Sequence, residues 1–249
     1  MELLGKIKPR SIGPGGMAGR STSIDVDHGQ SEIIYVGTAS GGLWKSTSGG
    51  VTWNAIFDNQ TTSSIGAVAI QQSNPSVIWV GTGEGNPRNS SNGGDGIYKS
   101  LDGGKNWIKM GLEKSRNIHR IIIHPQNPNI VYVAVIGSPW GSHPERGVFK
   151  TIDGGTNWDR ILFTNESSGA ADIVMDPHNP NKLIAALWDH HRDPWFFRSG
   201  GAGSGLFISY DAGKTWAQKS GENGLPKGNL GRIGLAVAPN SPNIIYALI

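Results

Sequence analysis

The sequence predicts an all-β protein built from repeated four-stranded sheets. Two interleaved repeats and a glycine-rich, charge-poor composition carry this prediction. The clearer repeat is an eight-residue motif that occurs four times, as STSGGVTW (46–53), SLDGGKNW (100–107), TIDGGTNW (151–158) and SYDAGKTW (209–216). Successive copies start 54, 51 and 58 residues apart. Self-similarity at a period of about 50 residues indicates a repeat architecture.

Each copy of the motif predicts a β-hairpin. The residues before it read GLWK, GIYK, GVFK and GLFI, and this alternation is typical of a strand. Asp-Gly-Gly or Asp-Ala-Gly then supplies a tight turn, because the carboxylate accepts from following backbone N–H groups and glycine adopts positive φ. A tryptophan adds apolar surface on the return strand. The structural positions expected from the four copies are Ser48, Trp53, Asp102, Trp107, Asp153, Trp158, Asp211 and Trp216.

The second repeat consists of two apolar strands joined by a polar turn, in most copies with an Asn-Pro or Ser-Pro step. It occupies 23–38, 67–82, 121–135, 172–187 and 235–249. Added to the motif hairpins, it makes four strands per period, which is the composition of a β-propeller blade. We therefore expect one β-propeller segment over 1–249. Its blades are expected at about 20–58, 64–110, 116–162 and 167–218, with a half-blade at 229–249.

The fifth blade has only its first two strands and no motif hairpin. Residues 3–8 could add one strand to a ring, but not two. We therefore expect about four and a half blades, as the N-terminal part of a larger propeller with further blades C-terminal to Ile249.

Composition excludes several classes of protein. Glycine makes up 37 of 249 residues and charged residues only 16%, against about a quarter in typical domains, which favours short strands and turns. Lysine and arginine are scattered, so no nucleic-acid-binding face is expected. No apolar run is long enough to span a membrane, and the first ten residues lack the apolar region of a secretory signal. Without cysteine there is no disulfide or thiolate metal site, and no cofactor is expected.

The loops between the second and third strands are expected to share one face, opposite the motif hairpins. Three of them are long, at 83–95, 137–146 and 188–204, and long loops on a rigid scaffold carry binding sites. Adjacent His190 and His191 would point to opposite sides of an extended segment, which disfavours a shared metal. Either the loops bind a glycan or peptide, or their aromatic residues cover the ends of the blades. The candidate ligand-binding residues are Arg88, Trp140, His143, Trp188, His190, Arg192, Trp195 and Phe196.

The same loops also carry acids that could catalyse glycoside hydrolysis. That reaction uses two carboxylates, about 5–5.5 Å apart for retention of configuration or about 6.5–9.5 Å for inversion. The alternative for each acid is a hydrogen-bonding role within its loop. The candidate acids are Glu84, Glu145, Asp189 and Asp193.

The motif S/T-x-D-x-G-x-T/N-W resembles the Asp-box, or BNR, repeat of sialidases, tandem-propeller xyloglucanases and sortilin-type receptors. In those families the box closes the hairpin between the third and fourth strands, away from the active site. Segments 10–20, 81–88 and 188–207 are similar to bacterial BNR propellers that resemble sortilin N-terminal propellers and are often described as glycosyl hydrolases. The resemblance covers most of the chain and implies a secreted or periplasmic location.

Neither known active site carries over to this sequence. The xyloglucanases of this type have a catalytic aspartate in a T-D-x-G-G context, and the matching stretch 38–42 has Ala39 there. The sialidase F-R-I-P segment has no match at 8–16. We therefore expect an extracytoplasmic scaffold that recognises a glycan or peptide. The first alternative is a glycoside hydrolase whose site is completed by further blades, and the second is a purely structural repeat module.

Overall fold

The structure, a computed structural model, describes residues 20–249, and its regular secondary structure consists almost entirely of antiparallel strands. The first sheet contains β1 (Ser21–Val26), β2 (Ile34–Thr38), β3 (Leu43–Ser46) and β4 (Asn54–Ala55). The second contains β5 (Ile65–Ile70), β6 (Ile78–Thr82), β7 (Ile97–Ser100) and β8 (Ile108–Lys109). The third contains β9 (Ile118–Ile123), β10 (Val131–Val135), β11 (Gly147–Thr151) and β12 (Asp159–Leu162).

The fourth sheet is larger and the fifth is smaller. The fourth contains β13 (Ser168–Met175), β14 (Leu183–Arg192), β16 (Gly205–Ser209) and β17 (Ala217–Lys219), with β15 (Phe197–Ser199) added to β14. A 3₁₀ turn, η2 (Gly221–Asn223), leads to the fifth sheet, β18 (Gly234–Val237) and β19 (Ile245–Leu248). No helix within residues 20–249 is long and apolar enough to cross a bilayer.

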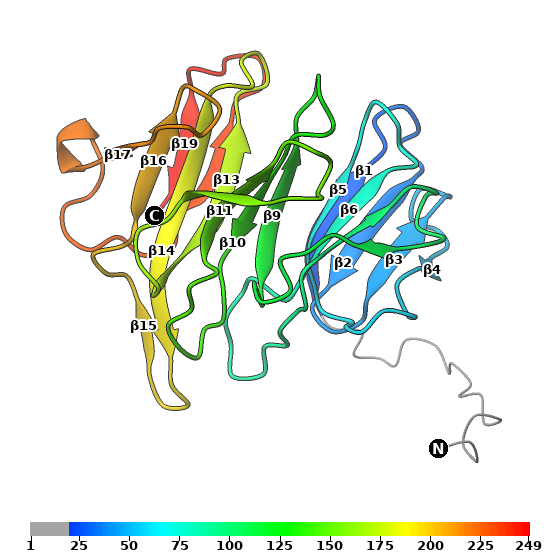
Figure 1. The fold of residues 1–249 in the computed structure, drawn as a ribbon, viewed down its shortest axis with the longest axis horizontal. Coiled ribbons are helices and arrows are strands. Elements are labelled where there is room, and N and C mark those ends of the chain that lie inside the picture. The colour runs from blue at the N-terminus through cyan, green and yellow to red at the C-terminus, as the bar shows by residue number, and fades with distance from the viewer. Residues whose placement is uncertain (1–19) are drawn as a thin grey trace.

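The sheets stand side by side as propeller blades (Figure 1), and the all-β propeller predicted from the sequence is confirmed. The first strands of neighbouring blades contact one another in the order β1, β5, β9, β13 and β18. These inner strands border a hollow of about 510 Å³, to which every blade contributes. The strand proposed for residues 3–8 lies outside the described residues.

The hydrophobic core lies between the blades rather than within one of them. Strands β6 and β10 are buried along their whole length, as expected for strands covered on both faces. Trp79 of β6 and Val133 of β10, for example, belong to one buried cluster shared by blades two and three. Each blade therefore depends on its neighbours to bury its apolar residues.

The motif hairpins have the turn geometry that their sequence predicts. In blade two the Asp102 carboxylate accepts from the backbone N–H of Lys105 at 3.0 Å and of Asn106 at 2.8 Å. These bonds and the Asn106 side chain lower the pKa of Asp102 to about 2. Gly103 and Gly104 have φ of 73° and 91°, which only glycine adopts without strain. In the first copy the hydroxyl of Ser48 accepts from the Thr52 N–H at 2.9 Å in the same way.

Two of the motif tryptophans also join neighbouring blades. Trp107 donates to the carbonyl of Ile56 at 2.8 Å, and Trp158 donates to that of Met110 at 2.7 Å, in each case on the preceding blade. Trp53 instead bonds within its own turn.

Segment 188–204, expected to be a loop, is instead partly a strand ladder. His190 pairs with Ser199 and Arg192 with Phe197, so β14 runs on beyond its blade as a hairpin with β15. The Trp188 and Phe197 rings meet edge to face at 5.7 Å and give this hairpin an apolar contact at its base. The segment connects the second and third strands as expected, but cross-strand pairing makes part of it an extension of the sheet.

Candidate functional site

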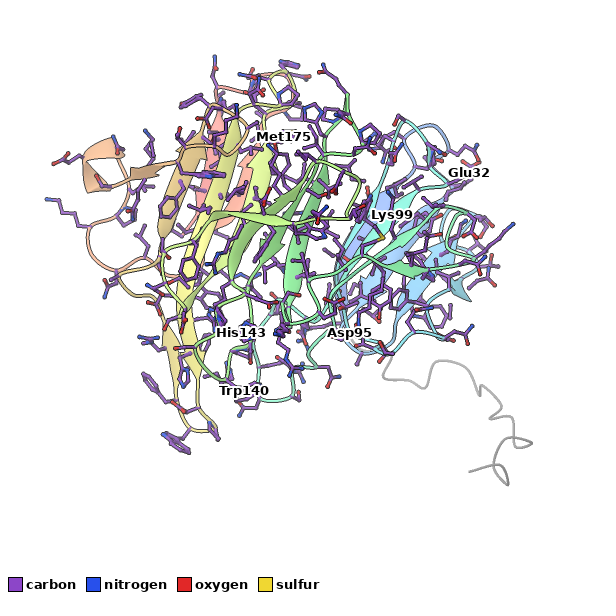
Figure 2. The ribbon with its side chains drawn as sticks, viewed as in Figure 1. Glu32, Asp95, Lys99, Trp140, His143 and Met175 are labelled. Carbon is purple, nitrogen blue, oxygen red and sulfur yellow. The ribbon has the colours of Figure 1, made fainter. Side chains whose placement is uncertain are left out.

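The long loops lie at one edge of the blades and the motif hairpins at the other. Figure 2 shows Asp95, Trp140 and His143 at the lower edge in this view, whereas Glu32 and Met175 lie toward the opposite edge. The β14–β15 hairpin extends from the same lower edge (Figure 1). The three long segments therefore form one surface, as alternating strand direction predicts, and we call this surface the loop face.

Arg192 ties the three long segments of the loop face together. Its backbone N–H donates to the carbonyl of Pro139 in segment 137–146 at 2.8 Å. Its guanidinium donates to Asn89 Oδ1 at 2.8 Å and to the Pro87 carbonyl at 3.3 Å, both in segment 83–95. The guanidinium also lies 4.3 Å from the ring centre of Phe197. Arg192 was expected to bind a ligand, but its guanidinium is engaged in protein contacts that fix the three long segments.

Three aromatic side chains are exposed on the segments that Arg192 joins. Trp140, on 137–146, is 44% exposed, and Trp195 and Phe196, at the tip of the β14–β15 hairpin, are 85% and 58% exposed. The tip is closed by hydrogen bonds between the backbones of Asp193 and Phe196. Because each ring is amphipathic or apolar and open to solvent, these three can stack on a bound molecule.

Trp188 and His190, the other aromatic candidates, are buried. Their rings stack at 4.3 Å with an interplanar angle of 15°, and both side chains are almost fully covered. Burial lowers the pKa of His190 to about 3, and nearby Arg146 adds to this effect. His190 is therefore neutral near pH 7, and the pair forms the interior of the β14–β15 hairpin base rather than a surface for stacking.

Arg146, at the end of segment 137–146, is a fully buried cation. Its guanidinium donates to the carbonyls of Ser138, Gly141 and Ser167, and lies 3.4 Å from Nδ1 of His190. Burial lowers its pKa to about 10. Several carbonyl groups converge under segment 137–146 and need hydrogen-bond donors. The Arg146 side chain supplies these donors where an apolar side chain could not.

Two of the four candidate acids are held by arginines. Glu84 is buried and forms an ion pair with Arg20. Asp189 is buried and pairs with Arg198 at 2.9 Å. Both carboxylates are covered and already engaged by a guanidinium, so neither is open to contact a substrate.

The remaining sequence candidates are more open. Asp193 is partly exposed and lies 3.4 Å from Nε2 of His191. Glu145 is partly exposed, and its N–H donates to Nδ1 of His143 at 3.2 Å. Burial lowers the pKa of His143. Arg88 is exposed, and its Nε donates to the hydroxyl of Ser90 at 2.9 Å. Within residues 20–249 no three His, Cys, Asp or Glu side chains gather as metal ligands.

A second cationic cluster joins distant parts of the loop face. Arg232, between η2 and β18, donates from Nη1 to Asn86 Oδ1 at 2.5 Å. Its Nη2 lies 2.7 Å from Nε2 of His119 in β9. The three residues are 33 and 113 positions apart along the chain, counted from 86 to 119 and from 119 to 232, and no local sequence pattern links them.

The comparison with protein families settles the kinship. The model for sortilin, neurotensin receptor 3 (Sortilin-Vps10) matches residues 95–220, slightly more than half of the chain. The chain belongs to the sortilin-Vps10 family. The matched range covers the second, third and fourth motif hairpins and all of blades three and four, with the β14–β15 hairpin included.

The curated relatives of this sortilin-type chain are xyloglucanases. Xyloglucanase Xgh74A of Acetivibrio thermocellus is 27% identical over 244 residues, which is 84% of this chain and 26% of the relative. A xyloglucanase of Hypocrea jecorina is 25% identical over 238 residues, with the same two shares. The sortilin-type chain thus spans about a quarter of the length of these relatives.

The solved structures agree with this assignment. The GH74 enzyme of Niastella koreensis has a TM-score of 0.59 at 27% identity, and covers 80% of this chain and 29% of its own. An ancestral GH74 enzyme has a TM-score of 0.67 at 23% identity over 92% of this chain, which supports the propeller fold. The comparisons indicate that the sortilin-type chain is a glycoside hydrolase-like propeller segment.

Proposed function

We propose that these blades bind a polysaccharide on the loop face, as part of a glycoside hydrolase-like propeller whose catalytic carboxylates lie at least partly outside the 249 residues. This is the hydrolase alternative of the sequence analysis. It is preferred to a general glycan or peptide scaffold because the curated relatives act on xyloglucan, as their names state.

The observation that carries the proposal is the exposed aromatic rim formed by Trp140, Trp195 and Phe196. A sugar ring has an apolar face of C–H groups, which stacks on an aromatic ring, and an equatorial belt of hydroxyls, which bonds to nearby polar groups. The rim is held by Arg192, which joins all three long segments. Preorganisation of this kind reduces the entropy lost when a ligand binds.

The state of the acids supports a divided active site. Glu84 and Asp189 are each neutralised by an arginine, and Ala39 stands where the xyloglucanase pattern has its aspartate. Among the described residues, Glu145 and Asp193 are not paired with an arginine. They lie on two different segments of the loop face. A hydrolase needs two carboxylates across one cleft. The relatives are about four times as long as this chain, which leaves room for the missing acid on further blades.

The same kinship supports an extracytoplasmic location, because polysaccharides of this class are met outside the cytoplasm. The proposed partners are a glycan ligand and further propeller blades. No nucleic acid, cofactor or metal has a role in the proposal.

Affinity electrophoresis in gels that contain xyloglucan or another soluble plant polysaccharide tests the binding. Trp195→Ala is expected to weaken binding by roughly two- to tenfold, since an aromatic stack contributes about 0.5–1.5 kcal/mol. Trp53→Ala is the matched control, because Trp53 is a partly exposed tryptophan of a motif hairpin, on the opposite edge. Binding to no polysaccharide, or equal binding by the Trp195 variant, would contradict the proposal.

A reducing-sugar assay tests the division of the active site. The purified 249-residue chain is expected to bind polysaccharide without releasing new reducing ends. Hydrolysis by this chain alone, abolished by Glu145→Gln or Asp193→Asn, would show that the acids within it suffice.

A further inference from the structure

Arg232 lies at a junction of several blades on the loop face. It is half-buried, and its guanidinium meets Asn86 from blade two at 2.5 Å and His119 from blade three at 2.7 Å. The guanidinium carbon also lies 5.6 Å from the ring centre of Trp188 in blade four. These contacts fix the plane of the guanidinium and hold its charge between blades two, three and four.

The positive charge of Arg232 has no carboxylate beside it in the part of the chain that the structure describes. Every ion pair found within residues 20–249 involves other cations. Asp172, whose charge acts on Arg232 through space, is bound by Arg120 at 2.9 Å and by the Leu235 N–H at 3.0 Å. Arg232 thus differs from Arg20 and Arg198 on the same face, each of which has its own acid.

His119 is neutral and does not change the net positive charge of the Arg232 cluster. Burial and the neighbouring Arg232 lower the pKa of His119 to about 4, so its ring is neutral near pH 7. Its Nε2 then accepts from Arg232, and the proton sits on Nδ1 by inference from this bond. A half-buried guanidinium without a counter-ion costs free energy, and an anion brought by a ligand would offset that cost.

Arg232 also has unused hydrogen-bonding capacity. A guanidinium carries five N–H donors, and the described contacts direct two of its nitrogens at Asn86 and His119. The planar fork binds a carboxylate through two parallel hydrogen bonds. A carboxylate is therefore the group that would best complete this site.

A hollow of about 230 Å³ lies beside His119. Its lining combines apolar side chains with hydroxyl and cationic groups, which matches the apolar face and polar belt of a sugar ring. The lining residues are Thr22, Ser23, Ile24, Ala67, Val68, His119, Arg120 and Ile121. Because His119 lines the hollow and is bonded to Arg232, a ring in the hollow would lie beside Arg120 and next to the Arg232 cluster.

We propose that the polysaccharide bound at the loop face is acidic, of the uronic acid class, and that Arg232 binds one of its carboxylates with the sugar ring in the adjacent hollow. This inference rests on the proposed function, since it names the substrate class of the same face. It departs from the xyloglucan of the relatives, because xyloglucan has no carboxylate for such a site.

The test compares polygalacturonate with the same polymer after its carboxyls have been reduced to alcohols, and with xyloglucan. The wild-type chain is expected to bind the acidic polymer at least tenfold more tightly than the reduced one, and less tightly as salt is raised. Arg232→Gln is expected to lose roughly ten- to hundredfold of that affinity, since a charged hydrogen bond contributes about 1.5–3 kcal/mol. Lys105→Gln, with the same change of charge on an exposed motif hairpin, should bind like wild type.

The unaltered chain keeps the test decisive even if Arg232→Gln does not fold, because the acidic and reduced polymers differ only in their carboxyls. Arg232→Lys, which keeps the charge but loses the planar fork, provides a second variant and should bind with intermediate affinity. If the reduced polymer or xyloglucan binds as tightly as the acidic polymer, and Arg232→Gln does not change that binding, the acidic substrate is wrong. The proposed function would still stand. Binding of no polysaccharide overturns both.

Discussion

The ammonium of Lys99 lies 4.6 Å from the ring centre of Trp79, its cross-strand neighbour in blade two. The same Nζ donates to the carbonyl of Gly154 in the motif hairpin of blade three, at 3.2 Å. Lys45 over Tyr35 and Lys150 over Tyr132 repeat the arrangement, and bond to Gly103 and Ala212 of the next blade. Each lysine thus links an aromatic of its own blade to the turn of the following one.

Blade four lacks this link. Ile208 stands in place of the lysine and pairs with Ile184 in place of the aromatic. Both isoleucines pack against the apolar cluster that joins blade four to β18 and β19.

Lys99→Met is expected to destabilise the chain by about 1–2 kcal/mol, because it removes a charged hydrogen bond and a cation–π contact while keeping the apolar stem. Urea denaturation followed by tryptophan fluorescence measures the change. Lys105→Met is the control, since Lys105 is exposed in the motif hairpin of the same blade and is expected to change stability by less than about 0.5 kcal/mol. Equal stability of Lys99→Met and wild type would mean that apolar packing alone joins the blades.

The strands and hairpins could be predicted from the sequence because their causes are local. Alternating apolar residues, an Asp-Gly-Gly turn and a following tryptophan specify a hairpin within about twelve residues. The inter-blade role of Lys99 had a sequence signal, the lysine repeated in GLWK, GIYK and GVFK. It could have been found by asking why three copies keep a lysine in a buried strand.

The candidate site was harder to predict, because its contacts join residues from different blades. Arg232, His119 and Asn86 meet only through the packing of three sheets, and no spacing in the sequence records that. The burial of Trp188 and His190 was also missed, since an aromatic that continues an apolar strand looks the same as one that begins a loop. The segments that carry the exposed rim were identified because length and composition alone indicate a surface loop.

Asp102→Asn should reduce the sensitivity of the fold to acid. Hydrogen bonds lower the pKa of Asp102 and Asp211 to about 2 and also lower that of Asp153, below the ordinary value of 3.8. A lowered folded-state pKa contributes stability that is present above about pH 4 and is lost as the pH falls toward 2. Wild-type stability should therefore drop across this window, and the variant should show a shallower drop from a lower starting value.

The measurement is a series of urea unfolding curves between pH 5 and 2. Ser48→Asp is the complementary variant, because Ser48 occupies the turn position that Asp102 occupies in blade two. It is expected to gain stability at pH 6 and to lose that gain by pH 2. A pH-independent effect of both substitutions would show that the carboxylate charge is not what holds the turn.

Arg146→Met is expected to be among the most destabilising single substitutions in the loop face. It leaves the carbonyls of Ser138, Gly141 and Ser167 without the donor that they share, while the methionine fills only part of the volume. Breaking a buried charged network of this kind costs about 3–5 kcal/mol. Thermal unfolding of the variant beside Arg160→Met, an exposed arginine that stacks on Phe163, measures the difference. Similar losses in the two would assign no special role to the buried guanidinium.

The buried histidines predict a second, milder window of acid sensitivity. Burial lowers the pKa of His190 to about 3 and that of His119 to about 4, below the ordinary 6.5. The unfolded chain therefore takes up protons at a higher pH than the folded one, so stability falls as the pH drops from about 6.5 toward 4. His190→Phe keeps the stack on Trp188 without a titrating nitrogen and should flatten this part of the curve. Urea midpoints at pH 7, 6, 5 and 4 give the slope, and an unchanged slope in the variant would show that His190 does not titrate on unfolding as its burial requires.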